Sequence, residues 1–173
     1  MKNVRIIILT ALSLWLSGTG FTQNSDYGKV KSHRKNNIDF TLGGSGLLAS
    51  INYGRIVAVK SNYFINLSAG IGIVPFSGGF TVPHQLTFNL GTGSSFLELG
   101  FGGSYWRGKS DASGFTETLS SYHVSPVIGW RKHFDNNLIF RAYINPLIHI
   151  TGEYYINEYS FIPYLGLSLG YSF

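Results

Sequence analysis

His123 and Ser125 are the residues of this 173-residue chain whose types and spacing could support a reaction. They are two positions apart, so on a β-strand their side chains project from the same face. A histidine beside a hydroxyl is the minimal arrangement that activates a serine nucleophile. A carboxylate that would orient the histidine is not evident, because Asp135 and Asn137 follow at a turn at the wrong end of the predicted strand. We therefore expect a structural role for both residues.

Several other ionisable residues fall on the polar side of predicted strands. We expect these to form an internal polar network: Asp39, Glu98, Arg131, Arg141 and His149, with His123 and Ser125 included. Charges inside a narrow barrel are costly unless they are paired. Glu98 and Arg141 match best in position along their strands, so we predict that they pair.

The sequence predicts no metal and no cofactor. Its histidines and carboxylates are scattered and match no metal-ligand spacing. Its glycines recur at alternate strand positions and not between a strand and a helix, so they do not form a phosphate-binding loop. His84 falls on the apolar face of its strand near a rim, which indicates an interfacial position.

The elements that must position these residues are β-strands. Eight segments alternate between apolar and small or polar residues, and we predict strands at 37–43, 47–57, 63–74, 80–90, 96–106, 118–134, 138–150 and 161–173. Gly43 to Gly46 is either a turn or a kink in one long strand, and an even strand number requires the turn. After it, Leu47 is expected to face outward and Leu48 inward.

The connections differ in length. Those at 58–62, 91–95 and 134–137 are short, whereas 107–117 and 151–160 are predicted to be longer polar loops. Aromatic residues near strand ends are typical of the interfacial girdles of a barrel: Tyr53, Tyr63, Tyr105, Trp106, Trp130, Tyr159 and Tyr171.

The last strand has an apolar residue at every second position and ends on an aromatic. Its outward series is Leu165, Leu167, Leu169, Tyr171 and Phe173. Such a strand resembles the closing strand of outer-membrane β-barrels, which the assembly machinery of those families reads as a signal. Residues 37–173 resemble the small eight-stranded barrels of Gram-negative bacteria. The resemblance implies a closed, all-β, antiparallel up-and-down transmembrane barrel in the outer membrane, with lipid, including lipopolysaccharide, and the barrel-assembly machinery as partners.

Composition agrees with a barrel. Charged residues are only 12% of the chain and there are no cysteines, yet no mature segment offers the roughly 18 unbroken apolar residues of a spanning helix. The alternative fold is a soluble secreted barrel or sandwich, whose outer face would carry charges. The non-apolar face here is largely glycine, serine, asparagine and threonine, which suits a narrow lumen.

The N-terminal region is expected to be separate from the barrel. Residues 1–20 have a basic start and an apolar centre, which predict a signal peptide cleaved near 20–23; a membrane anchor helix is the alternative. Residues 24–36 are basic and expected to be a flexible leader. Charges balance over 37–173, so the basic pI indicates no nucleic-acid partner.

Two classes of function remain open. One is a non-enzymatic barrel with a structural, adhesive or binding role through loops 107–117 and 151–160, acting on an unidentified external ligand. The other is a lipid-modifying enzyme, since the lipid A deacylases are similar in having a small barrel and a His-x-Ser pair on a strand. Their pair faces lipid, whereas His123 and Ser125 are predicted to face inward. A porin is disfavoured because side chains fill an eight-stranded barrel.

Overall fold

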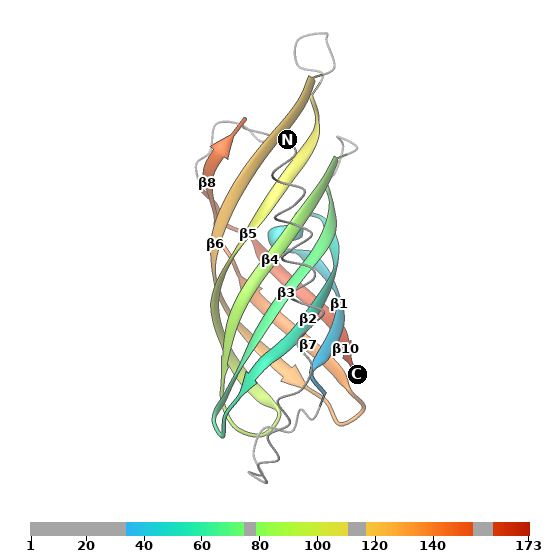
Figure 1. Ribbon diagram of the computed structural model, residues 1–173, viewed down its shortest axis with the longest axis vertical. Coiled ribbons are helices and arrows are strands. Elements are labelled where there is room, and N and C mark those ends of the chain that lie inside the picture. Colours follow the sequence, from blue (N-terminus) through green and yellow to red (C-terminus); the bar gives the residue numbers. More distant parts are fainter. Residues whose placement is uncertain (1–33, 75–78, 111–116, 154–160) are drawn as a thin grey trace.

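A computed structural model describes residues 34–74, 79–110, 117–153 and 161–173. The chain forms a tall barrel of tilted antiparallel strands (Figure 1). Its elements are β1 (Asn36–Gly43), the 3-10 turn η1 (Gly44–Gly46), β2 (Ala49–Val59), β3 (Tyr63–Val74), β4 (Gly79–Leu90), β5 (Ser95–Ser110), β6 (Glu117–His133), β7 (Leu138–Ile144), β8 (Leu147–Gly152), β9 (Phe161–Ile162) and β10 (Leu165–Ser172). Within these described ranges, no helix is long and apolar enough to cross a membrane.

The sheet closes on itself. Neighbouring strands follow the order β5-β4-β3-β2-β1-β10-β7-β6, and β5 pairs with β6 to complete the ring. β8 continues the line of β7, and β9 precedes β10 and pairs with β8. The wall therefore has eight strand lines, and the predicted closed, eight-stranded antiparallel barrel is confirmed.

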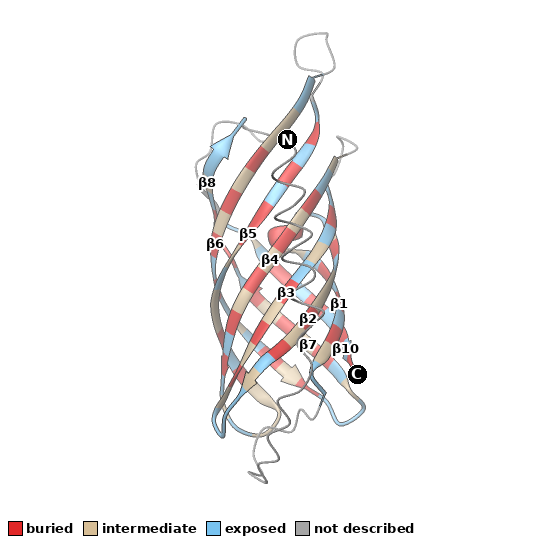
Figure 2. Ribbon diagram, viewed as in Figure 1, coloured by how far each residue is buried: buried red, intermediate tan, exposed pale blue. Residues whose placement is uncertain are grey.

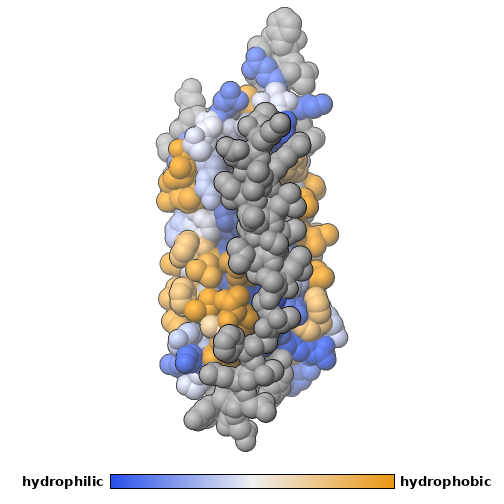
Figure 3. All heavy atoms as spheres, viewed as in Figure 1, coloured by the Kyte–Doolittle hydropathy of each residue, from blue (hydrophilic) through white to orange (hydrophobic). Residues whose placement is uncertain are grey.

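Side chains alternate between the two faces of the wall, as the sequence predicts. In β10, Leu165 and Leu167 are exposed while Gly166 and Ser168 are buried. Figure 2 shows the same banding along the other strands. On the visible face in Figure 3, hydrophobic residues gather on the side of the barrel and hydrophilic ones at its two ends. The apolar series is thus the outer surface and the small or polar series lines the lumen.

Two strands are interrupted where a continuous strand was predicted. The segment 138–150 breaks at Asn145 and Pro146, and the closing strand breaks at Pro163 and Tyr164. Proline has no N–H to donate to a ladder, which accounts for both breaks.

The loop predicted at 107–117 is wrong at its ends. β5 and β6 continue through them, pairing Lys109 with Thr118 and Ser110 with Glu117. The rest of that loop, and residues 154–160 of the second one, lie outside the described residues.

The N-terminal boundary is one residue earlier than predicted, because β1 begins at Asn36 and the Lys35 carbonyl already accepts a hydrogen bond from Ile56 N at 2.7 Å. The predicted signal peptide 1–20, and residues 24–33 of the basic leader, lie outside the described residues. The end of the leader thus belongs to the rim of the barrel.

The connection between β1 and β2 is a turn that folds into the barrel. Gly43 and Gly44 have φ of 72° and 63°, and Leu47 has φ of 67°. Leu47 and Leu48 have the reverse of the predicted orientations, with exposed fractions of 4% and 52%. The left-handed backbone at Leu47 turns its side chain into the lumen, and the alternation resumes at Ala49.

The inward turn predicts a specific sensitivity at Gly44. A Cβ at this position would lie 2.5 Å from the Tyr143 hydroxyl oxygen, whereas one at Gly93, with φ of 77°, would meet no atom within 4 Å. Both alanine variants carry the left-handed backbone penalty of about 1–2 kcal/mol. We expect Gly44→Ala to lose a further ~1–3 kcal/mol through overpacking, as measured by urea unfolding of the refolded barrel. Equal losses for Gly44→Ala and Gly93→Ala would contradict the inward placement.

Candidate functional site

The lumen is filled in layers, and the lowest layer is apolar. Ile56, Phe64 and Phe96 form a buried cluster near the short turns, in which the two phenyl rings meet edge to face with centroids 4.9 Å apart. Arg131 lies next to it, with its guanidinium 5.4 Å from the centre of the Phe64 ring. Its Nε donates to His133 Nε2 at 2.9 Å. An apolar floor and a buried cation thus lie at the end nearest the C-terminus.

Arg141 is the centre of the next layer. Its Nε and Nη2 donate to the two carboxylate oxygens of Glu98 at 3.0 and 2.8 Å. Nη2 also donates to Gln85 Oε1 at 3.1 Å, and Nη1 lies 3.8 Å from Asp39 Oδ1. The guanidinium is 4.9 Å from the centre of the Tyr143 ring. This bidentate geometry is the strongest form of an arginine–carboxylate pair.

Asp39 is held by neutral donors as well as by Arg141. Its Oδ1 accepts hydrogen bonds from Thr41, Asn52 and Ser168 at 3.0, 3.1 and 3.0 Å, and its Oδ2 accepts one from Asn37 at 3.1 Å. Because β1, β2 and β10 each supply a donor, this carboxylate joins the two sides of the β1–β10 closure. A buried charge with this many partners is compensated.

The inward turn lies above this ionic layer and is bonded to the wall. Ser45 is 1% exposed. Its Oγ accepts from Asn145 Nδ2 at 2.7 Å, and its carbonyl accepts from Ser104 Oγ at 2.7 Å. Thr81 Oγ1 donates to the Gly46 carbonyl at 3.3 Å. Beside the turn is a cavity of about 10 Å³, roughly the space of one water.

An aromatic layer follows above the turn. Leu47, Trp106 and Leu147 pack together there with Tyr164 against them. The His123 ring stacks on Trp106 with centroids 4.0 Å apart. The prediction that Trp106 belongs to an aromatic girdle is wrong, since it is 1% exposed and points into the lumen. Trp106 lies an even number of residues from Glu98 and Ser104, which face inward on the same strand, so its position in the sequence already indicated an inward side chain.

The structure places the predicted site residues in two separate groups. Asp39, Glu98 and Arg141 meet, with Arg131 in the adjacent layer. His149 lies higher, its ring 5.1 Å from that of His123. His123 and Ser125 form no hydrogen bond with Glu98 or Arg141, and Ser125 Oγ has no partner among the described residues, so the expectation that they join the ionic network is corrected. The two do not bond to one another either, because His123 is stacked on Trp106.

Sequence reasoning missed several members of the network: Asn37, Ser45, Gln85 and Asn52. Strand parity predicts an inward side chain at three of them, but only the closed barrel brings them to a carboxylate or guanidinium. The inward position of Ser45 could not be predicted from the sequence, because its turn folds into the lumen only in the closed barrel. Among the described residues, no group of three histidines or carboxylates could hold a metal ion.

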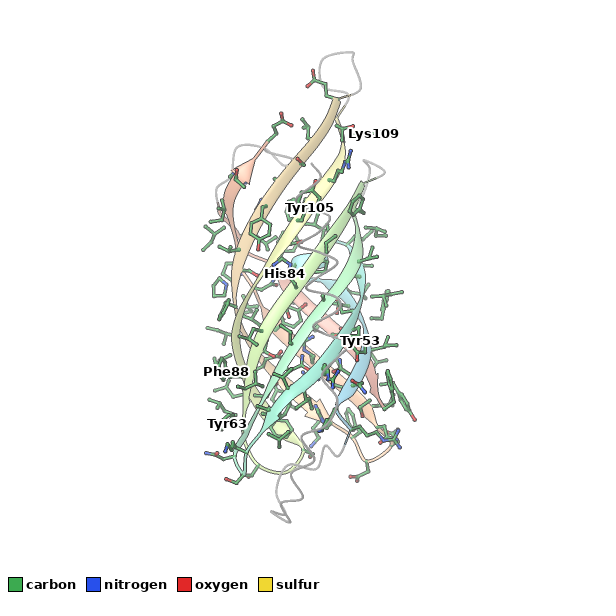
Figure 4. All side chains as sticks on the ribbon, viewed as in Figure 1. Tyr53, Tyr63, His84, Phe88, Tyr105 and Lys109 are labelled. Carbon is green, nitrogen blue, oxygen red and sulfur yellow. The ribbon has the colours of Figure 1, made fainter. Side chains whose placement is uncertain are left out.

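The outer wall carries a polar pair at its upper part. His84 Nε2 lies 2.8 Å from the Tyr122 hydroxyl, across Gly103. Figure 4 shows His84 below Tyr105 and Lys109, and Tyr63 at the opposite end. The outward side of His84 is as predicted, and Figure 4 shows it between Tyr105 and Phe88; its interfacial depth stays a prediction.

No protein-family model matches this chain, and no curated protein matches it. Among solved structures, the N-terminal β-barrel domain of Pseudomonas aeruginosa OprF is similar. The two share 14% sequence identity with a TM-score of 0.61, over 81% of this chain and 98% of that domain. At this identity the likeness shows the fold, a small closed β-barrel, and it leaves the function to be argued from the residues.

The ionic layer predicts a large effect of Arg141→Met. The substitution leaves Glu98 and Asp39 as buried anions without their cation, and we expect a loss of about 3–5 kcal/mol in unfolding free energy. Adding Glu98→Gln should recover part of this loss, because one of the two uncompensated charges disappears. Arg107→Met, on the exposed outer end of β5, is the control and should stay within about 0.5 kcal/mol. Equal effects of the two arginine variants would refute the paired geometry.

Proposed function

We propose that this chain is an outer-membrane β-barrel protein with a non-enzymatic, structural or binding role. The observation that carries the proposal is the combination of a closed wall, an apolar outer surface and an interior in which Arg141 is paired with Glu98 and Asp39. Closure supplies wall backbone groups with partners from neighbouring strands, which is what lipid demands of a spanning sheet. The similar fold of the OprF barrel domain supports the closed-barrel architecture on which the proposal rests.

The exposed surface favours lipid over water. Large hydrophobic side chains stand out from the wall on every side, for example Ile71 at 68%, Phe101 at 61% and Ile128 at 61% exposure. Soluble monomers rarely expose contiguous apolar patches beyond a few hundred Å². A lipid-facing wall flanked by residues such as Tyr63 and Tyr105 is the arrangement expected of a membrane barrel.

The topology gives a consistent orientation. The short turns at 60–62, 91–94 and 134–137 lie at the same end as the C-terminus (Figure 1), which we assign to the periplasm. The long β5–β6 hairpin then extends to the cell exterior, where 107–117 and 151–160 are the proposed contact regions for an unidentified ligand. Lipopolysaccharide is the expected lipid neighbour, and the series Leu165 to Phe173 is the proposed signal for the assembly machinery.

A catalytic role is not supported by the arrangement of His123 and Ser125. The histidine stacks on Trp106 and no hydrogen bond joins it to Ser125 Oγ. Serine activation needs base and hydroxyl within hydrogen-bond reach. The proposed role therefore rests on the wall and the exterior loops.

Membrane placement predicts a depth-dependent cost of charge on the outer wall. Leu167 lies midway along β10, whereas Leu138 follows the turn at 134–137, and both are exposed at 44% and 37%. We expect Leu167→Arg to destabilise the barrel by about 2–4 kcal/mol in lipid vesicles and Leu138→Arg by ~0–1 kcal/mol. Unfolding in urea measures both. Similar small effects at the two positions would show that the wall does not face lipid.

The filled lumen predicts that the native protein carries no ions. In planar bilayers we expect no steady conductance, since the Phe64–Phe96 floor, the Arg141–Glu98 pair and the inward turn occupy successive levels of a narrow barrel. Insertion is verified separately by the heat-dependent gel mobility of the folded barrel. A steady, voltage-independent current from inserted protein would contradict the scaffold role and favour a channel.

A further inference from the structure

Two prolines oppose each other across the wall between β6 and the β7–β8 line. Pro126 faces Pro146, because the register advances evenly between the pairs that flank them: Val124 with Ile148, and Ile128 with Ile144. Neither residue has an N–H to give to the other's carbonyl. At this level the ladder therefore lacks the two N–H···O bonds that a hydrogen-bonded pair of other residues would form.

A third proline extends this row to the next strand. Pro163 faces Pro146 on its other side, again by even register between flanking pairs: Ile144 with Leu165, and Leu147 with Ile162. Between these pairs, one backbone hydrogen bond crosses the break, from Asn145 N to the Tyr164 carbonyl at 2.9 Å. Three neighbouring strands thus each place a proline at opposing positions, and we name Pro126, Pro146 and Pro163 the proline seam.

The seam lies beside an edge of the described sheet. β1 pairs with β10 only as far as Gly43 opposite Gly166. Above that level, the strand that carries Pro163 has no neighbour on its β1 side among the described residues. The segment around Pro163 therefore has fewer backbone hydrogen bonds than the neighbouring parts of the wall, both toward β8 and toward β1. Regions with few backbone hydrogen bonds open at the lowest free-energy cost.

Polar groups without partners lie directly behind the seam. Ser125 adjoins Pro126 and Asn145 adjoins Pro146, and alternation turns both side chains inward, where they are 1% and 0% exposed. Ser125 Oγ, Asn145 Oδ1 and, nearby, His123 Nδ1 have no hydrogen-bond partner within the described part of the chain. Buried polar atoms are nearly always hydrogen-bonded in folded proteins, so these atoms are open to a bound hydrogen-bonding group.

The remaining surroundings define the chemistry of that partner. Val127 and Leu147, also adjacent to the seam prolines, are buried at 1% and 0% exposure, and Leu147 packs on Trp106. The charges of Arg141 and Glu98, in the ionic layer below, are bonded to each other. A ligand here would meet neutral hydrogen-bonding atoms beside apolar and aromatic side chains.

We propose that the proline seam is a lateral portal, through which an uncharged amphiphile passes from the membrane to Ser125, Asn145 and His123. Its hydroxyl or amide head would bond these three side chains, while its chain leaves through the seam along the exposed Ile128 and Ile144. This proposal rests on the membrane placement argued above. A neutral head suits the site, because its described surroundings are neutral polar and apolar side chains.

The absence of cysteine from the sequence permits a direct test by labelling. Ser125→Cys is refolded into phosphatidylcholine vesicles and treated with membrane-soluble N-dodecylmaleimide, and the added mass is followed in time. Ser68→Cys is the matched control: Ser68 is also buried, and it lies on the same register line through Gln85 and Gly102 but across the barrel from the seam. We expect Ser125→Cys to react about tenfold faster or more. A water-soluble sulfonated maleimide should label both slowly.

Closing the seam should remove this difference. Pro126→Val with Pro146→Val restores two N–H donors, and it should slow the labelling of Ser125→Cys to the rate of the control. In the native wall, 1-dodecanol should compete with the maleimide at Ser125→Cys more strongly than laurate does. Equal competition by laurate would overturn the neutral-head assignment.

The possible outcomes distinguish a failure of the portal proposal from a failure of the proposed membrane placement. Equal labelling of Ser125→Cys and Ser68→Cys in inserted protein, or faster labelling by the water-soluble reagent, overturns the portal. An unchanged rate after seam closure does the same. If the valine variant fails to fold, the comparison of the two cysteines in the native wall still decides. Failure of the protein to insert into vesicles would instead overturn the membrane placement.

Discussion

Backbone hydrogen bonding is the constraint on which this structure depends. A sheet in lipid has no water to satisfy its edges, so it must close, and here β1 pairs with β10 while β5 pairs with β6. Eight strand lines enclose a space that is only wide enough for side chains. Closure therefore imposes a second requirement on the fold: a polar side chain that points into the lumen needs a hydrogen-bond partner from another strand.

Arg141 meets that requirement for the centre of the lumen. Its guanidinium reaches Glu98, Gln85 and Asp39, which come from three different strands. The ionic layer thus joins distant parts of the chain through direct side-chain contacts. The inward turn adds a second set of cross-links through Ser45, whose hydroxyl and carbonyl bond to the wall. The interior is organised as levels of different chemistry, apolar at the floor, ionic in the middle and aromatic above.

The proline seam is one local interruption of backbone pairing in the described wall. A proline on the wall removes a donor wherever it stands, and aligning Pro126 with Pro146 concentrates the loss at one place. The aromatic level, with its neutral polar atoms, lies behind that place. Strained or weakly bonded backbone tends to persist where function needs it. The association of a weak wall with unpartnered polar atoms is what gives the seam its functional meaning.

Side-chain alternation is a local property with period two, so most strands, the identity of their two faces and the closing strand could be predicted from the residues alone. The sequence also identified Glu98 and Arg141 as a pair, since both are charged and point inward. Only the closed barrel shows the inward turn, the burial of Leu47, and the separation of His123 and Ser125 from the ionic layer. The alignment of the three prolines also emerged only there. These features depend on strand register around a closed ring, which relates residues far apart in the chain, and no local pattern encodes it.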